Sequence, residues 1–312
     1  MIIVDGHCDT LSKIHDSNEN LMSNQCHADI SRMKKAGKYV QLFSVFVDSK
    51  QGPLNNVKKA MSIISYALRQ FEKYNEEIML CLNYNDIITA IGKNKIAAVM
   101  IIEGGDVLNG RISTLNIMYR LGIRGMGLTW NYNNDLAHAA MDSSEEKGLT
   151  PFGIEVVQYM NDKKMIIDVS HLSEHDFWDL MSKTDRPFIA SHSNCRSICD
   201  VPRNLTDKQI IALAKRGGVI GVNFYPYFLN SKGKASIDDI IRHIEHICGL
   251  AGEEAAGIGS DFDGIDTTPY DLKGVEDIEK LYNKLAQLNY KQSLIEKIAG
   301  MNFLNALKKI LA

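Results

Sequence analysis

Residues 1–9, MIIVDGHCD, combine a short apolar run with two candidate metal ligands directly after it. The apolar run favours a buried β-strand. His7 and Asp9 stand two positions apart, so on a strand their side chains project to the same side. An imidazole and a carboxylate at a strand end can bind a divalent ion such as zinc. Because His-x-Asp is common by chance, its meaning depends on the rest of the chain.

Composition narrows the class of protein. The 312 residues are 45% hydrophobic and 23% charged, which suits a globular protein with an ample core. The net charge of −3 gives no basic surface for nucleic acid or an anionic membrane. No apolar run reaches the length of a membrane span, and the apolar start is too short for a signal peptide. With six cysteines that we expect to be reduced, we predict a cytoplasmic protein without nucleic-acid or membrane partners.

Apolar, β-branched segments alternate with segments of helical period. We predict strands at 2–7, 41–48, 97–103, 123–130, 165–170, 187–191, 219–225 and 257–261. We predict helices at 60–74, 112–121, 152–160, 206–216 (capped by Thr206) and 237–250. Eight such alternations predict an α/β fold, a TIM-type (β/α)8 barrel, with a doubly wound open sheet as the alternative.

No linker divides the chain, so residues 1–312 are expected to form a single domain, with the segment from 276 onward adding C-terminal helices. Two long connections, 9–39 and 131–151, are expected to be loops that shape a substrate pocket.

Polar residues recur where the predicted strands end. Glu103 ends the third strand, His171 follows the fifth, His192 follows the sixth, and Asp261 ends the eighth. In a barrel the carboxyl ends of the strands share one rim, where active sites lie. Together with the N-terminal motif, these residues would form a ring of imidazoles and carboxylates.

This ring has the composition of a two-metal site. One ion would bind His7 and Asp9, the other His171 and His192, and Glu103 would be shared because a carboxylate has two oxygens. Nitrogen and oxygen donors of this kind suit zinc. Two ions roughly 4 Å apart can acidify a bridging water, which then attacks a carbonyl as hydroxide.

Each residue also has a structural alternative. A single histidine at a strand end is more often a hydrogen-bonded structural residue, and Asp261 could cap a turn. The shared rim is what favours the metal site. His243 and His246, three apart in a predicted helix, are expected on a solvent-exposed face. Cys195 and Cys199 are weak zinc candidates because no second cysteine pair accompanies them.

Seven short motifs occur in one order between residues 5 and 264. They are DGHCD (5–9), IEGG (102–105), DVSH (168–171), SHS (191–193), PRNL (202–205), VNFY (222–225) and GSDFDG (259–264). Through these motifs the chain resembles the membrane (renal) dipeptidase family, the M19 class of binuclear zinc peptidases, and looks like a soluble bacterial-type member.

The resemblance implies a metal-dependent hydrolase barrel with two Zn²⁺ ions on the five ligands proposed above. Asp261, with Glu103, would be catalytic, and Asp261 would carry a proton from the water to the leaving amine. Arg203 would bind the substrate's C-terminal carboxylate, and Tyr225 and Trp130 would contact the substrate in the pocket. Many family members carry a histidine where this chain has Trp130, whose indole can donate a hydrogen bond but cannot carry a proton. Asn131, Asn133 or His138 could replace that histidine, or the zinc ions could suffice without it.

We therefore expect a zinc dipeptidase that hydrolyses the amide bond of short peptides with free termini, including those with a D-residue at the second position. Two alternatives stay open: an amidohydrolase acting on lactams, lactones or N-acyl amino acids, and a non-catalytic family member that binds zinc or peptides. A homodimer is expected from the family resemblance alone.

Overall fold

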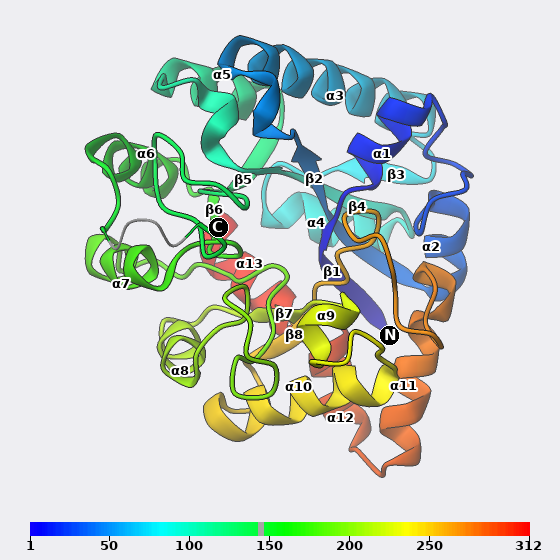
Figure 1. The fold of residues 1–312 in the computed structure, drawn as a ribbon. Coiled ribbons are helices and arrows are strands. Elements are labelled where there is room, and N and C mark those ends of the chain that lie inside the picture. The colour runs from blue at the N-terminus through cyan, green and yellow to red at the C-terminus, as the bar shows by residue number, and fades with distance from the viewer. Residues whose placement is uncertain (143–146) are drawn as a thin grey trace.

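A curled parallel β-sheet enclosed by helices forms the centre of the molecule (Figure 1). The computed structural model describes residues 1–142 and 147–312, so the connection 131–151 lies partly outside the described residues. The strands are β1 (Ile2–Cys8), β2 (Lys38–Phe46), β3 (Ile78–Leu80), β4 (Ile96–Glu103), β5 (Ile123–Gly127), β6 (Ile166–Asp168), β7 (Ile220–Val222) and β8 (Ala256–Ile258).

Neighbouring strands follow the order β6-β5-β4-β2-β1-β8-β7, with β3 paired to β4 beside this path. Every pairing is parallel, which confirms the predicted α/β class. Buried parallel strands are apolar on both faces, and all eight residues of β4 are buried. The three-residue strand β3 was not predicted from the sequence.

The predicted strand 187–191 is wrong as a regular strand. Only two of its residues form bridges, Ile189 to Asp168 and Ala190 to Ile220. Pro187 has no N–H to donate, so a ladder cannot begin there. The other strands of the second half are also shorter than predicted, because their last residues leave the sheet to form the rim.

Helices connect the strands and cover the sheet (Figure 1). They are α1 (Thr10–Ser17), α2 (Ile30–Ala36), α3 (Pro53–Lys73), α4 (Tyr84–Gly92), α5 (Ile112–Arg120), α6 (Pro151–Asp162), α7 (Glu174–Lys183), α8 (Asp207–Lys215), α9 (Pro226–Leu229), α10 (Ile237–Ala251), α11 (Ile278–Gln287), α12 (Gln292–Glu296) and α13 (Asn302–Leu311). The predicted cap is confirmed, since Thr206 and Gln209 form a capping box at the start of α8. Among the described residues, no helix has the length and apolarity that crossing a bilayer requires.

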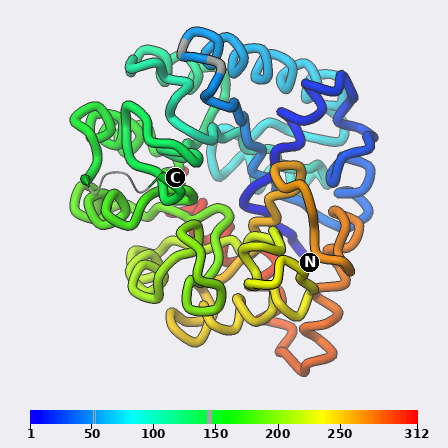
Figure 2. The backbone as a smooth tube through the Cα atoms, viewed as in Figure 1, coloured from blue at the N-terminus to red at the C-terminus, as the bar shows by residue number. Residues whose placement is uncertain are grey.

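The connection 9–39 was expected to be a loop, and this is wrong because it contains α1 and α2. Both helices are short, eight and seven residues, and α1 begins directly after the N-terminal metal motif, so their periodicity is hard to separate from the loop. The loop after β8 lies beside this segment (Figure 2), and Val275 donates a backbone hydrogen bond to His27.

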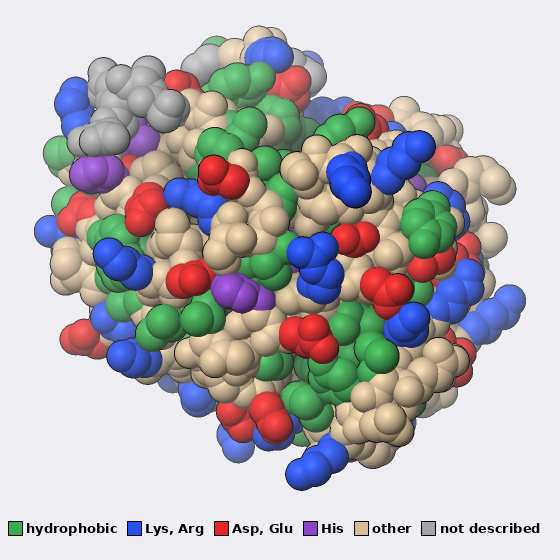
Figure 3. Space-filling model, turned by 60° about the horizontal axis from the view of Figure 1, so that its bottom comes forward, with side chains coloured by type: hydrophobic (Ala, Val, Ile, Leu, Met, Phe, Trp, Pro, Cys, Tyr) green, Lys and Arg blue, Asp and Glu red, His purple; other side chains and the backbone are tan. Residues whose placement is uncertain are grey.

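The C-terminal segment confirms the predicted additional helices. A π-helical turn, η4 (Lys297–Met301), packs on β1 and β8 and leads into α13. Phe303 of α13 fills the space beside Gly6 and Gly257, where an added Cβ would overlap its ring. On the face in Figure 3, acidic and basic side chains are interspersed over the surface.

Candidate metal centre

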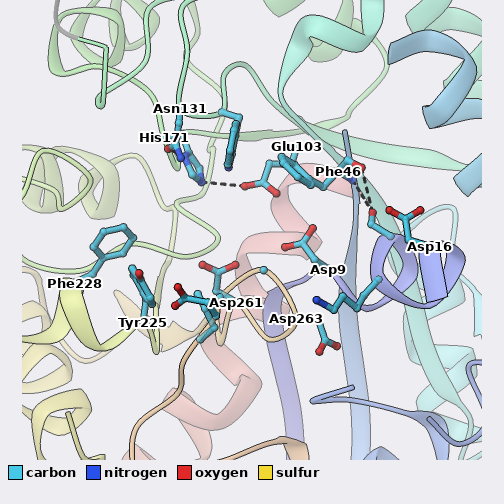
Figure 4. A pocket seen from close by; sticks show the side chains of 16 residues that line it. Asp9, Asp16, Phe46, Glu103, Asn131, His171, Tyr225, Phe228, Asp261 and Asp263 are labelled. Carbon is cyan, nitrogen blue, oxygen red and sulfur yellow. Dashed lines mark hydrogen bonds and ion pairs between the residues drawn. The ribbon is translucent and has the colours of Figure 1, made fainter. Parts of the chain in front are cut away.

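Side chains from four strand ends meet in one buried cluster at the carboxyl ends of the sheet. Figure 4 shows the members that face the cavity, Asp9, Glu103 and His171. His7 and Asp9 come from the end of β1, and Glu103 is the last residue of β4. His171 follows β6, and His192 follows the bridge residues 189–190. All five are buried. The structure thus brings together the residues that the sequence placed on one rim.

Glu103 lies between two groups of candidate ligands. Its Oε2 is 3.4 Å from His7 Nε2, while its Oε1 is 2.9 Å from His171 Nε2 and 3.6 Å from His192 Nε2. His171 and His192 approach each other to 3.0 Å through their Nε2 atoms. Each oxygen of one carboxylate therefore faces a different set of imidazoles.

The donor atoms fit divalent metal ions. Glu103, His171 and His192 form one group whose potential ligand atoms lie within 4.8 Å of one another, and His7, Asp9 and Asp261 form a second. Asp9 Oδ2 lies 3.3 Å from His7 Nε2, whereas Asp9 Oδ1 is buried without a hydrogen-bond partner in the part of the chain that the structure describes. A buried carboxylate oxygen without a donor is costly, and a cation would satisfy it.

The ionisation of the cluster reflects burial and mutual charge. Burial, together with the charge of the nearby Arg203, lowers the pKa of His171 to about 4. Burial opposes a proton on His7 as well, but the carboxylates of Glu103 and Asp9 raise its pKa well above the usual value. Burial would raise the pKa of Glu103, yet His7 and the hydrogen bonds from the other imidazoles hold it well below its usual range. A metal ion would displace the proton from His7, so metal binding is coupled to proton release.

Asp261 lies beside the same group. Its Oδ2 accepts a hydrogen bond of 2.8 Å from Asn223 Nδ2. Burial raises its pKa to about 8, with His7 lowering it and Asp9 and Glu103 adding to the increase. Its backbone has φ of 61°, in the left-handed region. The chemistry available to this carboxyl is proton transfer or metal coordination.

Hydrogen bonds to the far ring nitrogens orient the imidazoles, and sequence reasoning did not predict them. His171 Nδ1 lies 2.9 Å from Asn131 Oδ1, and His192 Nδ1 lies 2.7 Å from Ser191 Oγ. Such contacts leave Nε2 free to bind a metal. The available signal was position, since Ser191 belongs to a quoted motif and Asn131 directly follows Trp130.

A cavity of about 480 Å³ opens over the cluster. The predicted pocket residues Trp130 and Tyr225 both line it. Trp130 packs on Phe46 with ring centroids 4.9 Å apart. The other lining residues are Asp9, Ser12, Lys13, Asp16, Glu103, Asn131, His171, Phe228, Asp261, Asp263, Gly264, Ile265 and Asp266.

Arg203 does not line the cavity but lies directly behind it. It is 3% exposed, and its guanidinium lies 5.7 Å from the ring centre of the lining residue Phe228. It donates to the carbonyl of His192 at 3.0 Å and to Ser193 Oγ at 3.4 Å. Its Nε has no partner among the described residues. Arg203 is therefore an interior residue and not a surface one.

The prediction that His243 lies on a solvent-exposed face is wrong. The side chain is fully buried, because residue 243 falls on the inward face of α10 together with Ile240, Ile244 and Ile247. Its Nδ1 accepts the backbone N–H of Cys195 at 3.0 Å, and its Nε2 donates to the carbonyl of Leu229 at 2.9 Å. His246, by contrast, has a side chain that is 27% exposed.

The sequence and the fold were compared with those of known proteins. The family model described as membrane dipeptidase (peptidase family M19) matches residues 1–312. The chain belongs to the membrane dipeptidase family. Membership confirms the resemblance seen in the sequence and makes this M19 protein a metallo-dipeptidase, a metal-dependent hydrolase of dipeptides.

Relatives and solved structures agree with membership. The M19 chain is 37% identical over 242 residues to an uncharacterised Klebsiella pneumoniae protein, covering 75% of this chain and 89% of the relative. It is 34% identical over 302 residues to an uncharacterised dipeptidase of Schizosaccharomyces pombe, covering 91% and 72%. Its fold matches a Rhodobacter sphaeroides metallopeptidase, liganded with a phosphinate mimic of the dipeptide L-Ala-D-Ala, with a TM-score of 0.93 at 24% identity over 99% of both chains.

Proposed function

We propose that this metallo-dipeptidase holds two Zn²⁺ ions, one on His7 and Asp9 and the other on His171 and His192, with Glu103 shared. The observation that carries the proposal is the position of Glu103, whose two oxygens face the two groups at 2.9 and 3.4 Å. Asp9 Oδ1, which is buried without a hydrogen-bond partner among the described residues, supports it independently. When bound, the ions would supply a Lewis acid for the peptide carbonyl and make a water acidic enough to attack it at neutral pH.

The chain's own residues would then handle the protons and the substrate. Asp261, held by Asn223 at 2.8 Å, is placed to take a proton from the attacking water and to deliver it to the leaving nitrogen. Arg203 would bind the free C-terminal carboxylate, because a guanidinium can donate two parallel hydrogen bonds and its Nε lacks a partner among the described residues.

Trp130 stands where many family members have a histidine, and we propose that its indole N–H and the amide of Asn131 replace that histidine as donors. Both residues line the cavity next to His171. Of the three candidate replacements, His138 instead contacts Asp176 at 3.2 Å, and Asn133 accepts the backbone N–H of Ala139 at 2.8 Å. Tyr225 would pack against the substrate from the opposite wall.

The preferred substrates would be dipeptides with free termini, including those with a D-residue at the second position. Support comes from the Rhodobacter sphaeroides relative of the same fold, which is liganded with a mimic of L-Ala-D-Ala. A cavity of about 480 Å³ is large enough for a dipeptide.

The test is a panel of L,L- and L,D-dipeptides, with N-acetylated and C-amidated versions of each, after zinc loading and metal analysis. We expect two zinc ions per chain, turnover of free dipeptides, and loss of turnover when either terminus is blocked. Turnover of N-acyl amino acids or lactams without turnover of any free dipeptide would instead support the amidohydrolase alternative. Two bound zinc ions without any hydrolysis would support a binding protein.

We further propose that residues 1–312 form one domain in which the sheet closes as an eight-stranded barrel through residues 187–191. The single bridges of Ile189 to Asp168 and of Ala190 to Ile220 support closure, as does the adjacency of β1 to β8. A homodimer and a cytoplasmic location stay predictions, to be tested by sedimentation and by cell fractionation.

A further inference from the structure

One serine hydroxyl lies where three buried polar groups converge beneath the metal centre. Ser191 Oγ contacts Asp168 Oδ2, lies 2.7 Å from His192 Nδ1 and lies 3.4 Å from His7 Nδ1. His7, Asp168 and His192 are a third set of potential ligand atoms within 4.8 Å of one another. Because the Ser191 hydroxyl already contacts all three side chains, we interpret this set as a hydrogen-bond network and not as a metal site.

The direction of each hydrogen bond in this network follows from Asp168. Its Oδ1 accepts the backbone N–H groups of Ser170 at 3.0 Å and Ser191 at 2.9 Å. A carboxylate accepts and does not donate, so the single proton of the Ser191 hydroxyl points to Asp168 Oδ2. The lone pairs of Ser191 Oγ then face His7 and His192, and both imidazoles must donate through Nδ1–H.

This assignment determines the other side of each ring. With the proton on Nδ1, the Nε2 atom of a neutral imidazole carries a lone pair. His7 Nε2 faces Glu103 Oε2 at 3.4 Å, and His192 Nε2 faces Glu103 Oε1 at 3.6 Å. The two rings belong to different groups of candidate ligands, so one hydroxyl sets the tautomer of one imidazole in each group.

We propose that Asp168 and Ser191 are positioning residues that fix the tautomer and orientation of His7 and His192 together, and so couple the two halves of the metal centre. The expected effect on metal binding rests on the proposed function, whereas the assignment of the two tautomers rests only on the hydrogen bonds described above. Asn131 fixes the tautomer and orientation of His171 alone, through its contact with Nδ1.

The fold holds Ser191 rigidly enough for this role. Gly6, Gly221 and Gly259 pack against its carbonyl oxygen so closely that a Cβ on any of them would overlap with it. The residues come from β1, from β7 and from the segment after β8, so the interior of the sheet fixes the serine from several sides. The backbone of Ser191 therefore cannot shift to follow a displaced imidazole.

Asp168→Asn gives the sharpest test. The amide oxygen must stay where Asp168 Oδ1 accepts two backbone N–H groups, so the NH2 group would replace Oδ2 and donate to Ser191 Oγ. Of the remaining acceptors, His192 Nδ1 at 2.7 Å lies much closer to the serine oxygen than Ser170 Oγ at 3.5 Å. The serine proton would therefore turn to an imidazole, and that ring would lose its Nδ1–H. Imidazole ¹⁵N–¹H correlation spectra of the full chain, recorded without metal at a pH where these rings are neutral, would show at least one ring change to the Nε2–H tautomer.

Zinc affinity gives the second measurement, by competition with a chelator. We expect Ser191→Ala to weaken both zinc-binding events by roughly 10- to 100-fold, the usual effect of removing an outer partner of a ligand. Asn131→Ala should weaken only one event. Ser193→Ala is the matched control, because this buried serine contacts Ser170 and Arg203 but no imidazole, and both affinities should be unchanged.

The wild-type spectrum keeps the proposal testable even if a variant does not fold. An Nε2–H tautomer at His7 or His192 in the wild-type protein would overturn it, as would unchanged tautomers in Asp168→Asn. Failure of the wild-type chain to bind zinc would refute the proposed function, but it would leave the tautomer assignment to be judged by the spectra.

Discussion

Replacing Glu103 with glutamine would test the arrangement on which the metal centre depends. The carboxylate presents Oε1 to His171 at 2.9 Å and Oε2 to His7 at 3.4 Å, and the substitution leaves one of these positions as an NH2 group. An amide NH2 cannot ligate a cation, and both ions would also lose the shared negative charge. A contact to a charged group contributes about 1.5–3 kcal/mol. At 1.4 kcal/mol per factor of ten, the affinity for at least one zinc ion should therefore fall by roughly 10- to 150-fold.

The assay is zinc stoichiometry after dialysis against a weak chelator, followed by titration of the remaining sites. We expect wild-type protein to retain two ions and Glu103→Gln to retain one or none, with dipeptide turnover lost in proportion. Glu174→Gln is the matched control, because Glu174 is 39% exposed and pairs with Arg196 at 3.2 Å on the surface. If Glu103→Gln bound two zinc ions with wild-type affinity, a shared carboxylate would be refuted.

Three further predictions concern single residues. Asp261→Asn should keep its zinc and lose about 10²- to 10⁴-fold in kcat; metal analysis beside turnover checks this, and zinc loss would identify Asp261 as a ligand. Arg203→Lys should raise KM for free dipeptides but not for dipeptide amides, because the bidentate contact with the substrate carboxylate is lost. An equal rise in KM for both substrates would exclude that contact. Burial lowers the pKa of His243 to about 4, below the value of roughly 6.5 in the unfolded chain. Between these two pH values the unfolded chain binds more protons than the folded one. The stabilisation by neutral His243 is therefore complete above pH 6.5 and is lost as the pH falls towards 4. His243→Gln should flatten that part of the urea-unfolding profile, and an unchanged slope would contradict the assignment.

The convergence of the candidate ligands could be predicted from the sequence, because the ends of apolar strands can be recognised and parallel strands bring these ends together. Glu103 and His192 each follow an apolar run, and parallel strands bring their carboxyl ends to one edge. The prediction needed no knowledge of loops or of side-chain rotamers. The same reasoning located Asp261, although it could not decide between proton transfer and coordination.

The residues that support the ligands were beyond such reasoning. Ser191 and Asn131 act through single hydrogen bonds to ring nitrogens, and nothing in their local sequence distinguishes an orienting side chain from an ordinary polar one. His243 was misplaced for a related reason. Helical periodicity gives the buried face only approximately, and a histidine with two backbone partners is as easily buried as the isoleucines beside it.

Three residues of the rim have a backbone conformation in the left-handed region. His171, Asp261 and Asp263 adopt φ values of 71°, 61° and 69°, a region that costs a residue other than glycine on the order of 1 kcal/mol or more. Glycine would relieve this cost at each position but would remove an imidazole or a carboxyl from the cavity wall. Asp263 accepts hydrogen bonds from Thr10 at 2.6 Å and from the backbone of His27 at 2.7 Å, which join the loop after β8 to α1 and to the segment before α2. Contacts with segments outside the ligand cluster therefore help to hold Asp263 in its left-handed conformation.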